Sequence, residues 1–186
     1  MLNGLKPLSR SLRWGMVGGG GTSQIGYSHR CAALRDNVYT LLAGALDVDA
    51  ERGRAFGEQL GIAPERSYAD YQTLFREEAQ RPDGIEVVSV TTPNNTHFAI
   101  TKAALEAGKH VVVDKPFTVT LSQARELESL AKHCGRILSV FHNRRWDSDF
   151  LTVSALINEG QLGEVCYFES HFDRFRPQVR QRWREQ

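Results

Sequence analysis

The sequence has little of what marks membrane, disulfide-stabilised or nucleic-acid-binding proteins. None of its 186 residues belongs to a run near the roughly 20 apolar residues of a membrane span. Residues 1–13 lack the apolar core of a secretory signal. Cys31, Cys134 and Cys166 are odd in number and widely spaced, which argues against a disulfide framework or a metal cluster. The formal net charge is only +1, which gives no signal for nucleic-acid binding. With reduced cysteines, no export signal and no membrane span, we expect a cytoplasmic protein that binds neither membrane nor nucleic acid.

Short apolar runs, separated by amphipathic segments, occupy most of the chain. The runs are Leu12–Gly18, Tyr39–Leu46, Ile85–Val90, His110–Val113 and Ile137–Phe141. Continuous apolar runs are typical of strands that are buried on both faces. Their alternation with helical segments predicts the α/β class, with a doubly wound parallel sheet covered by helices on both sides.

Helix-capping signals divide the segments between these runs. Asp49 is expected to cap a helix that continues through Leu60. The segment Ser67–Asp70 resembles a capping box before a further helix, and Thr120 with Gln123 forms another. The helices therefore begin where a parallel sheet needs its crossover connections.

A glycine-rich loop follows the first predicted strand. It contains Gly18–Gly21, and a helix is expected to begin near Ile25. Such a loop lets the backbone approach a pyrophosphate, whose negative charge faces the helix N-terminus. The strict G-x-G-x-x-G spacing is not met, because Ser23 stands at the third glycine position; in a longer loop Gly26 takes the helix-packing role. The alternative is a plain tight turn.

Asp47, at the end of the second predicted strand, stands where an acidic residue binds the adenine-ribose hydroxyls of a dinucleotide. A carboxylate there would repel a 2′-phosphate, so we expect NAD to be preferred over NADP. The alternative is that Asp47 or Asp49 only caps the next helix. Asp49 suits the cap better, which leaves Asp47 free for the ribose.

Two further segments carry a family resemblance. Thr92–His97 (TPNNTH) follows the third apolar run, and Asp114–Pro116 (DKP) follows AGKHVVV. In this order and spacing, together with the glycine loop, they resemble the Gfo/Idh/MocA oxidoreductase family, whose pattern is a glycine loop, TPxxxH and ALxAGKHVxxEKP. The resemblance extends from Leu12 to about Phe172. The segment that begins at His142 (HNRRWDSDFLTV) is similar to members that act on inositols and related polyols or sugars.

The resemblance implies an NAD(P)-dependent dehydrogenase with a Rossmann sheet and no metal site. Lys115 would be catalytic, polarising the substrate hydroxyl or relaying its proton, and partial burial suits lysine to this by favouring the uncharged amine. Asp114, where the family usually has Glu, would position the neighbourhood of Lys115. The residues expected to contact the cofactor are Gly18, Gly20, Gly21, Thr22, Ser23, Gln24, Ile25, Asp47, Thr92, Pro93, Asn94, His97, Asp114, Lys115, Asn143 and Arg144.

The pattern changes near Asn143, which predicts two domains. Residues 1–143 are expected to form the NAD(P)-binding Rossmann domain, and residues 144–186 the incomplete start of an α/β substrate and oligomerisation domain. Asp147–Glu159 is expected to form a helix, and Gly163–Phe172 an antiparallel strand. Three residues of that helix are expected to face inward: Phe150, Val153 and Ile157.

The function expected from the resemblance is hydride transfer between a nicotinamide cofactor and a hydroxyl or carbonyl group of a sugar, inositol or related polyol. In the family, an Asp and a His from the second domain complete the active site, downstream of the residues present here, and the full-length proteins are homo-oligomers. The alternative is therefore a dinucleotide-binding fragment without catalytic activity.

Overall fold

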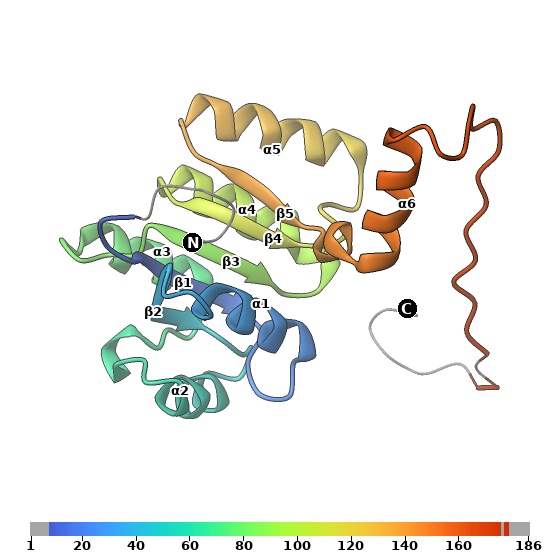
Figure 1. The fold of residues 1–186 in the computed structure, drawn as a ribbon. Helices are drawn as coiled ribbons and strands as arrows, with labels where there is room; N and C mark the ends of the chain where they lie inside the picture. The colour runs from blue at the N-terminus through green and yellow to red at the C-terminus, as the bar shows by residue number, and fades with distance from the viewer. Residues whose placement is uncertain (1–7, 176, 179–186) are drawn as a thin grey trace. The chain divides into compact units, whose positions relative to one another are not determined.

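The computed structural model describes residues 8–175 and 177–178 (Figure 1). The strands are β1 (Leu12–Gly18), β2 (Tyr39–Ala45), β3 (Val87–Thr91), β4 (His110–Asp114) and β5 (Leu138–Phe141). The α-helices are α1 (Gln24–Leu34), α2 (Ala50–Gln59), α3 (Tyr71–Gln80), α4 (His97–Glu106), α5 (Leu121–His133) and α6 (Ser148–Asn158). Short 3-10 helices are η1 (Pro64–Arg66), η2 (Asn94–Thr96) and η3 (Asn143–Trp146). Among these described residues, no helix has the length and apolar character needed to cross a membrane.

The strands form one parallel sheet in the order β2-β1-β3-β4-β5. This confirms the predicted doubly wound sheet. The chain moves from β1 outward to β2 and then returns to β3 on the other side of β1, so the direction of winding reverses between β1 and β3. In open parallel sheets, ligands bind at such a reversal, beyond the carboxyl ends of the strands.

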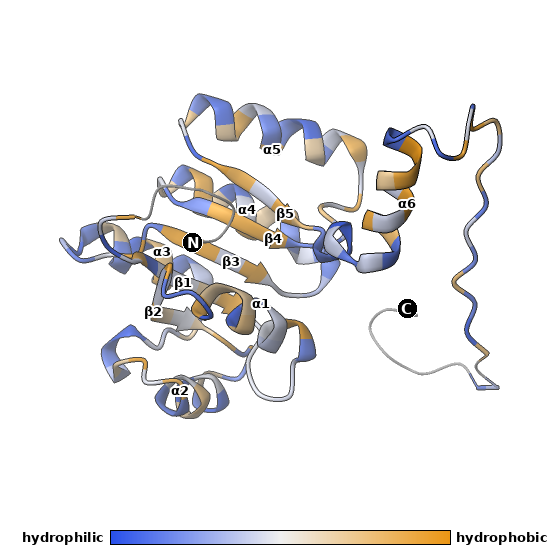
Figure 2. Cartoon of the chain, in the orientation of Figure 1, coloured by the Kyte–Doolittle hydropathy of each residue, from blue (hydrophilic) through white to orange (hydrophobic). Residues whose placement is uncertain are grey.

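The two faces of the sheet are covered by different helices. On one face, α3, α4 and α5 pack on a large cluster that includes Val88, Val90 and Val111. On the other face, α1 and α2 pack on a smaller cluster around Trp14 and Met16. Figure 2 shows the resulting hydrophobic strands between helices of mixed character. Both faces of the central strands are therefore buried, as their continuous apolar sequences predict.

The helix caps agree with the sequence in two cases and differ in one. Asp49 caps α2, accepting a hydrogen bond from the Arg52 amide at 3.0 Å, and Thr120 with Gln123 forms the predicted capping box of α5. The prediction of a capping box over Ser67–Asp70 is wrong. Asp70 itself caps α3, because its extended backbone directly precedes the helix and its carboxylate accepts from the Thr73 amide.

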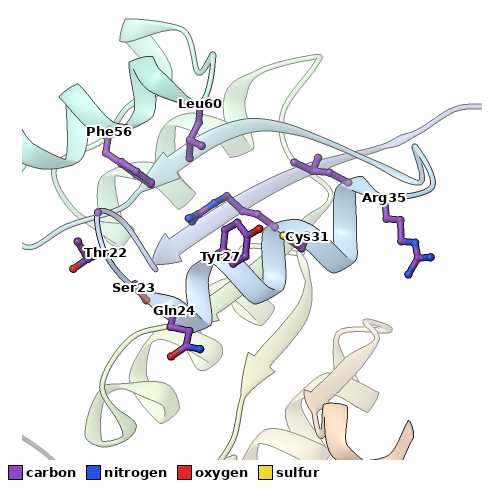
Figure 3. A pocket seen from close by; sticks show the side chains of 11 residues that line it. Thr22, Ser23, Gln24, Tyr27, Cys31, Arg35, Phe56 and Leu60 are labelled. Atoms are coloured by element: carbon purple, nitrogen blue, oxygen red, sulfur yellow. The ribbon is translucent and has the colours of Figure 1, made fainter. Parts of the chain in front are cut away.

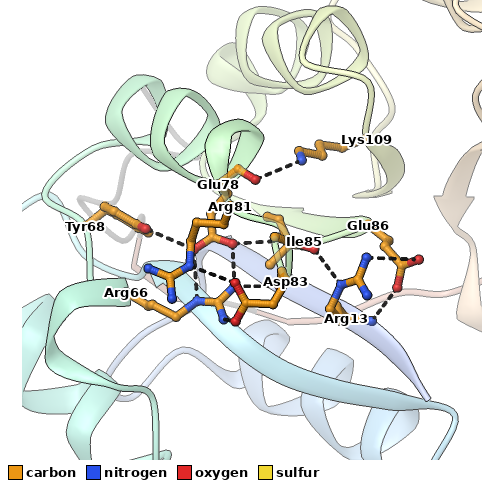
Figure 4. Close-up of polar contacts among 10 residues, drawn as sticks. Arg13, Arg66, Tyr68, Glu78, Arg81, Asp83, Ile85, Glu86 and Lys109 are labelled. Atoms are coloured by element: carbon orange, nitrogen blue, oxygen red, sulfur yellow. Dashed lines mark hydrogen bonds and ion pairs between the residues drawn. The ribbon is translucent and has the colours of Figure 1, made fainter. Parts of the chain in front are cut away.

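A buried polar network lies at the amino-terminal edge of the sheet, where the parallel strands begin (Figure 4). The Glu78 carboxylate is 1% exposed and accepts hydrogen bonds from Arg66 at 2.5 and 2.9 Å, from the Tyr68 hydroxyl at 2.9 Å and from the Ile85 amide at 3.0 Å. Burial, with the Glu78 contact, raises the pKa of Tyr68 to about 12. The network ties α3 and the segment around η1 to the start of β3.

The chain divides into two compact units, Met1–Phe141 and His142–Gln186. In the second unit α6 forms as predicted, between Asp147 and Glu159. The strand predicted over Gly163–Phe172 is wrong, because that segment has no strand paired with it among the described residues and a strand needs a hydrogen-bonded neighbour. Residue 176 and residues 179–186 of the predicted second domain lie outside the described residues.

The inward orientation predicted for the apolar side of α6 is also wrong. Phe150 is 52% exposed and Ile157 is 40% exposed. With Val153 they line an open pocket of their own unit, which Phe168 shares. Amphipathic spacing identifies which residues share a face of the helix, but burial needs an apolar surface opposite them.

Candidate functional site

The glycine loop Gly18–Gly21 connects β1 to α1 at the carboxyl edge of the sheet. Gly18 and Gly19 have φ values of +76° and +77°, a region that side chains other than glycine rarely adopt. A Cβ atom at Gly26, in the first turn of α1, would lie 2.1 Å from the Gly19 carbonyl oxygen. The helix therefore rests directly on the backbone of the loop. This is the packing role considered for Gly26 in a loop longer than G-x-G-x-x-G.

The start of α1 fits a bound pyrophosphate. Ser23 is its N-cap, with the hydroxyl oxygen accepting from the Gly26 amide at 3.2 Å. The first turn holds no acidic residue, so no carboxylate opposes the positive end of the helix dipole. Space around Gly21 is open, since a Cβ there would meet no atom within 4 Å. Thr22 and Gln24 are exposed beside it and Ile25 is half-buried, and their contacts with the cofactor stay predictions.

Arg30, to which no sequence motif pointed, contacts the glycine loop directly through its buried side chain. Its Nη1 donates to the Gly19 carbonyl oxygen at 2.7 Å, and its guanidinium lies 5.1 Å from the centre of the Phe56 ring. Burial lowers the pKa of Arg30. Spacing in the sequence could have identified Arg30. His29 and Arg30 lie three and four positions after Gly26, so they are on the same face of α1 as Gly26.

Asp47 follows β2, and the sequence predicted that its carboxylate would be free for the ribose. In the structure this carboxylate is already paired. One of its carboxylate oxygens, Oδ1, accepts from the Asp49 amide and from Arg52 Nη2, both at 2.9 Å. The Arg52 contact, followed by the Asp49 amide, holds the pKa of Asp47 below its usual value. A cation therefore accompanies the carboxylate, and Arg52 is a second residue that the sequence analysis missed. The sequence could have indicated this pairing, because Arg52 lies in the first turn of α2, the helix that follows Asp47.

The segment after β3 packs against the glycine loop and the segment after β4. A Cβ on Gly18 would lie 2.7 Å from the Thr92 methyl carbon. His97 is 0% exposed, and its ring nitrogens lie 2.9 Å from the Thr92 carbonyl oxygen and 2.8 Å from that of Pro116. The side chain of His97 thus joins two loops beneath the site, and its contact with the cofactor stays a prediction. Thr92, Pro93 and Asn94 retain some exposure.

Asp114 and Lys115 differ in burial although they are neighbours. Asp114 ends β4 and is buried, with its Oδ1 3.7 Å from His29 Nε2. Lys115 is exposed, so the partial burial expected for it is not found in this chain. A cis peptide bond joins Lys115 to Pro116. Within residues 8–175 and 177–178, no three His, Cys, Asp or Glu side chains gather as a metal-binding group.

Asn143 and Arg144 belong to η3 in the second unit. Both are exposed, and Arg144 Nη1 forms an ion pair with Asp147 Oδ2 at 3.0 Å. Contacts of Asn143 and Arg144 with the nicotinamide or the substrate stay predictions.

A groove of about 880 Å³ starts at the outer side of the glycine loop and continues between α1 and α2 (Figure 3). Tyr27, Cys31, Phe56 and Leu60 line it, together with residues of the loop. None of its lining residues follows β3 or β4. The strand ends that hold Thr92 and Lys115 therefore lie outside the lining of this groove.

Two family models match the chain. Residues 12–142 match the oxidoreductase family model described as an NAD-binding Rossmann fold, and residues 154–186 match the C-terminal α/β domain of the same Gfo/Idh/MocA family. The first match covers the glycine loop, Asp47 and the segments that end at His97 and Pro116.

Named relatives include dehydrogenases and oxidoreductases. The oxidoreductase YfiI of Bacillus subtilis is 51% identical over 89% of this chain and 42% of its own length. The NADP-dependent scyllo-inositol 2-dehydrogenase IolW of the same organism is 44% identical over 64% of this chain and 34% of its own length. A solved inositol dehydrogenase homologue from Azotobacter vinelandii, in complex with NAD⁺, is 54% identical with a TM-score of 0.82, over 88% of this chain and 42% of that one. The chain thus spans less than half the length of these relatives.

Proposed function

The chain belongs to the Gfo/Idh/MocA oxidoreductase family, and on this basis we propose that it is the NAD-binding part of a dehydrogenase for a sugar, inositol or related polyol. The reaction is hydride transfer between the nicotinamide cofactor and a CH–OH carbon of the substrate. When bound, the dinucleotide supplies the hydride acceptor at its nicotinamide ring. The chain's own residues bind and orient the reactants and handle the hydroxyl proton.

One observation carries the proposal: the glycine loop and the segment with Lys115 lie at the same edge of the sheet and are connected by packing. Gly18 ends β1 and lies against Thr92, and His97 links Thr92 to Pro116, the residue after Lys115. A phosphate-binding loop and a candidate proton-transfer group are thereby held in one connected framework. This is the arrangement that a dinucleotide-dependent enzyme needs to align its reactants.

The roles of individual residues follow from their surroundings. The amides of the loop and the α1 N-terminus would hold the pyrophosphate, with Arg30 fixing the loop from behind. Asp47 would accept hydrogen bonds from the adenine ribose, although Arg52 already occupies one of its oxygens. Lys115 would contact the substrate hydroxyl and move its proton. Its exposure leaves the amine accessible to a substrate.

The substrate class and the cofactor preference rest on different support. Polyols are favoured because two similar proteins are named for inositol, one of them solved with NADH and myo-inositol at 54% identity and a TM-score of 0.81 over 84% of this chain and 41% of that one. NAD is favoured over NADP because of the Asp47 carboxylate. The NADP-dependent name of IolW makes this preference a question for measurement.

The test is a fluorescence titration of the chain with NADH and NADPH, followed by turnover assays with NAD and myo-inositol, other inositols and hexoses. We expect NADH to bind more tightly than NADPH. We expect Lys115→Ala to keep NADH binding while lowering any turnover by about 10²-fold or more. No saturable NADH binding would contradict the proposal. NADH binding without turnover of any polyol or sugar would favour a non-catalytic dinucleotide-binding fragment.

A further inference from the structure

Two buried polar atoms face each other at the end of β4, one residue before Lys115. His29 Nε2, on the inner face of α1, lies 3.7 Å from Asp114 Oδ1, at the end of β4. Both atoms are shielded from solvent, and neither has a hydrogen-bond partner among the residues that the structure describes. Buried polar atoms are nearly always paired, and an unpaired one costs free energy. The pair therefore needs an explanation that packing alone does not supply.

The surroundings of His29 keep its ring directed at Asp114 and leave it room to move. The imidazole stacks on the Phe141 ring, with centres 3.9 Å apart and an angle of 35° between the planes. His29 and Phe141 also line a cavity of about 210 Å³ against the sheet, together with Ser89 and Val112. A shift of about 0.8 Å would bring Nε2 and Oδ1 to an ordinary hydrogen-bond distance near 2.9 Å.

The position of His29 in the chain connects the two halves of the site. Gly26, His29 and Arg30 are the buried residues of α1. Gly26 packs on Gly19, and Arg30 donates to the Gly19 carbonyl oxygen, so the glycine loop is in direct contact with the helix that carries His29. Asp114 is bonded through the backbone to Lys115.

We propose that His29 is a positioning residue that completes a hydrogen bond from Nε2–H to Asp114 when a dinucleotide occupies the glycine loop, and that it thereby couples cofactor binding to the placement of Lys115. The inference rests on the proposed function for its ligand. It adds one residue and one step to that function. When the cofactor binds, His29 Nε2 and Asp114 Oδ1 move into hydrogen-bond distance, so both buried atoms gain a partner. The bond then fixes the position of the Asp114–Lys115 segment at which the substrate binds.

The first experiment is an NMR titration of the ¹⁵N-labelled full chain with NADH, observing the imidazole nitrogens. The His29 Nε2 signal is expected to move to a hydrogen-bonded position at saturation. His110 is an internal control, because its Nδ1 accepts from the Ile137 amide at 2.9 Å near the opposite end of β4. Its signal is expected to stay unchanged. NADH binding with no change at His29 would overturn the inference and leave the proposed function intact.

The second experiment measures NADH dissociation constants of variants. His29→Phe keeps the stack on Phe141 but removes the donor, and we expect about fivefold weaker binding. His29→Gln keeps a donor with similar reach, and we expect binding within about twofold of the wild type. Tyr68→Phe is the control: it removes a 2.9 Å hydrogen bond to Glu78 at the amino-terminal edge of the sheet, away from the cavity beside His29, and we expect no change in NADH affinity.

A double-mutant cycle decides whether His29 acts through Asp114. If one hydrogen bond carries the effect, His29→Phe combined with Asp114→Leu weakens binding no more than the larger single change. Losses that multiply, or equal affinity of His29→Phe and the wild type, would overturn the inference. Absence of NADH binding by the wild-type chain would overturn the proposed function and the inference with it.

Discussion

The amino-terminal and carboxyl edges of the sheet differ in how their buried polar groups are paired. At the amino-terminal edge, the buried Glu78 carboxylate accepts hydrogen bonds from Arg66, Tyr68 and the Ile85 amide. At the carboxyl edge, glycines adopt left-handed conformations, Lys115 is exposed, and His29 and Asp114 face each other without a hydrogen bond. Satisfied buried polar groups stabilise a fold, and the unsatisfied pair of His29 and Asp114 is where we infer that a movement completes the structure.

The strongest way to break the amino-terminal edge is Glu78→Ala. It leaves the buried Arg66 guanidinium without its main partner, and we expect the free energy of unfolding to fall by about 3–5 kcal/mol. Urea denaturation measures this. Glu77→Ala, on the exposed side of the same helix, is the control and should cost less than about 0.5 kcal/mol. A small effect of Glu78→Ala would mean that the network contributes little to stability.

Gly26→Ala tests the carboxyl edge. The added methyl would meet the Gly19 carbonyl oxygen at 2.1 Å, so either α1 or the loop must shift. We expect a loss of about 1–3 kcal/mol in the free energy of unfolding and at least tenfold weaker NADH binding, measured by urea denaturation and fluorescence titration. Ser28→Ala, on the same helix, should leave both nearly unchanged. If Gly26→Ala bound NADH with the affinity of the wild type, the glycine loop would not be part of the NADH-binding site.

Acid should weaken the amino-terminal edge through Glu86. The side chain of Arg10 donates to Glu86 and, with the Arg13 amide, holds the pKa of this carboxyl at about 2. Because the pKa is lowered on folding, the stabilisation is complete above the unfolded value of about 4.5 and is lost as the pH falls toward 2. Glu86 is partly exposed, so we expect about 1 kcal/mol. Denaturation of Glu86→Gln should lack this share of the pH dependence; an unchanged profile would contradict the assignment.

The smallest expected effect concerns the cofactor at the carboxyl edge. Asp47→Ser removes the carboxylate that we expect to repel a 2′-phosphate, and Arg52 loses the nearer of its two carboxylate partners. We expect the affinity ratio of NADH to NADPH to fall by about fivefold, toward NADPH. Parallel titrations measure the ratio, with Asp49→Ser as the control for loss of a nearby carboxylate. A ratio that stays constant in Asp47→Ser would show that Asp47 does not select the cofactor.

The sequence by itself predicted the five strands of the first unit, their alternation with helices and the parallel sheet. Each strand is a continuous apolar run, and the glycine loop and the Asp114–Pro116 segment stand at strand ends that parallel topology brings to one edge. Local spacing was sufficient because periodicity, caps and turns depend on neighbouring residues. It was insufficient for Gly163–Phe172, since alternation favours a strand but a strand forms only with a partner.

Tertiary structure alone decided how the polar side chains of the site are used. Asp47 pairs with Arg52, His97 bridges two carbonyl groups, and His29 faces Asp114 across 85 positions of sequence. These contacts are set by how α1, α2 and the loops pack on the sheet, because that packing determines which distant groups share a desolvated space. Asp47, which seemed free in the sequence, is engaged by Arg52, and Asp114 faces His29, a helix residue to which no sequence motif pointed.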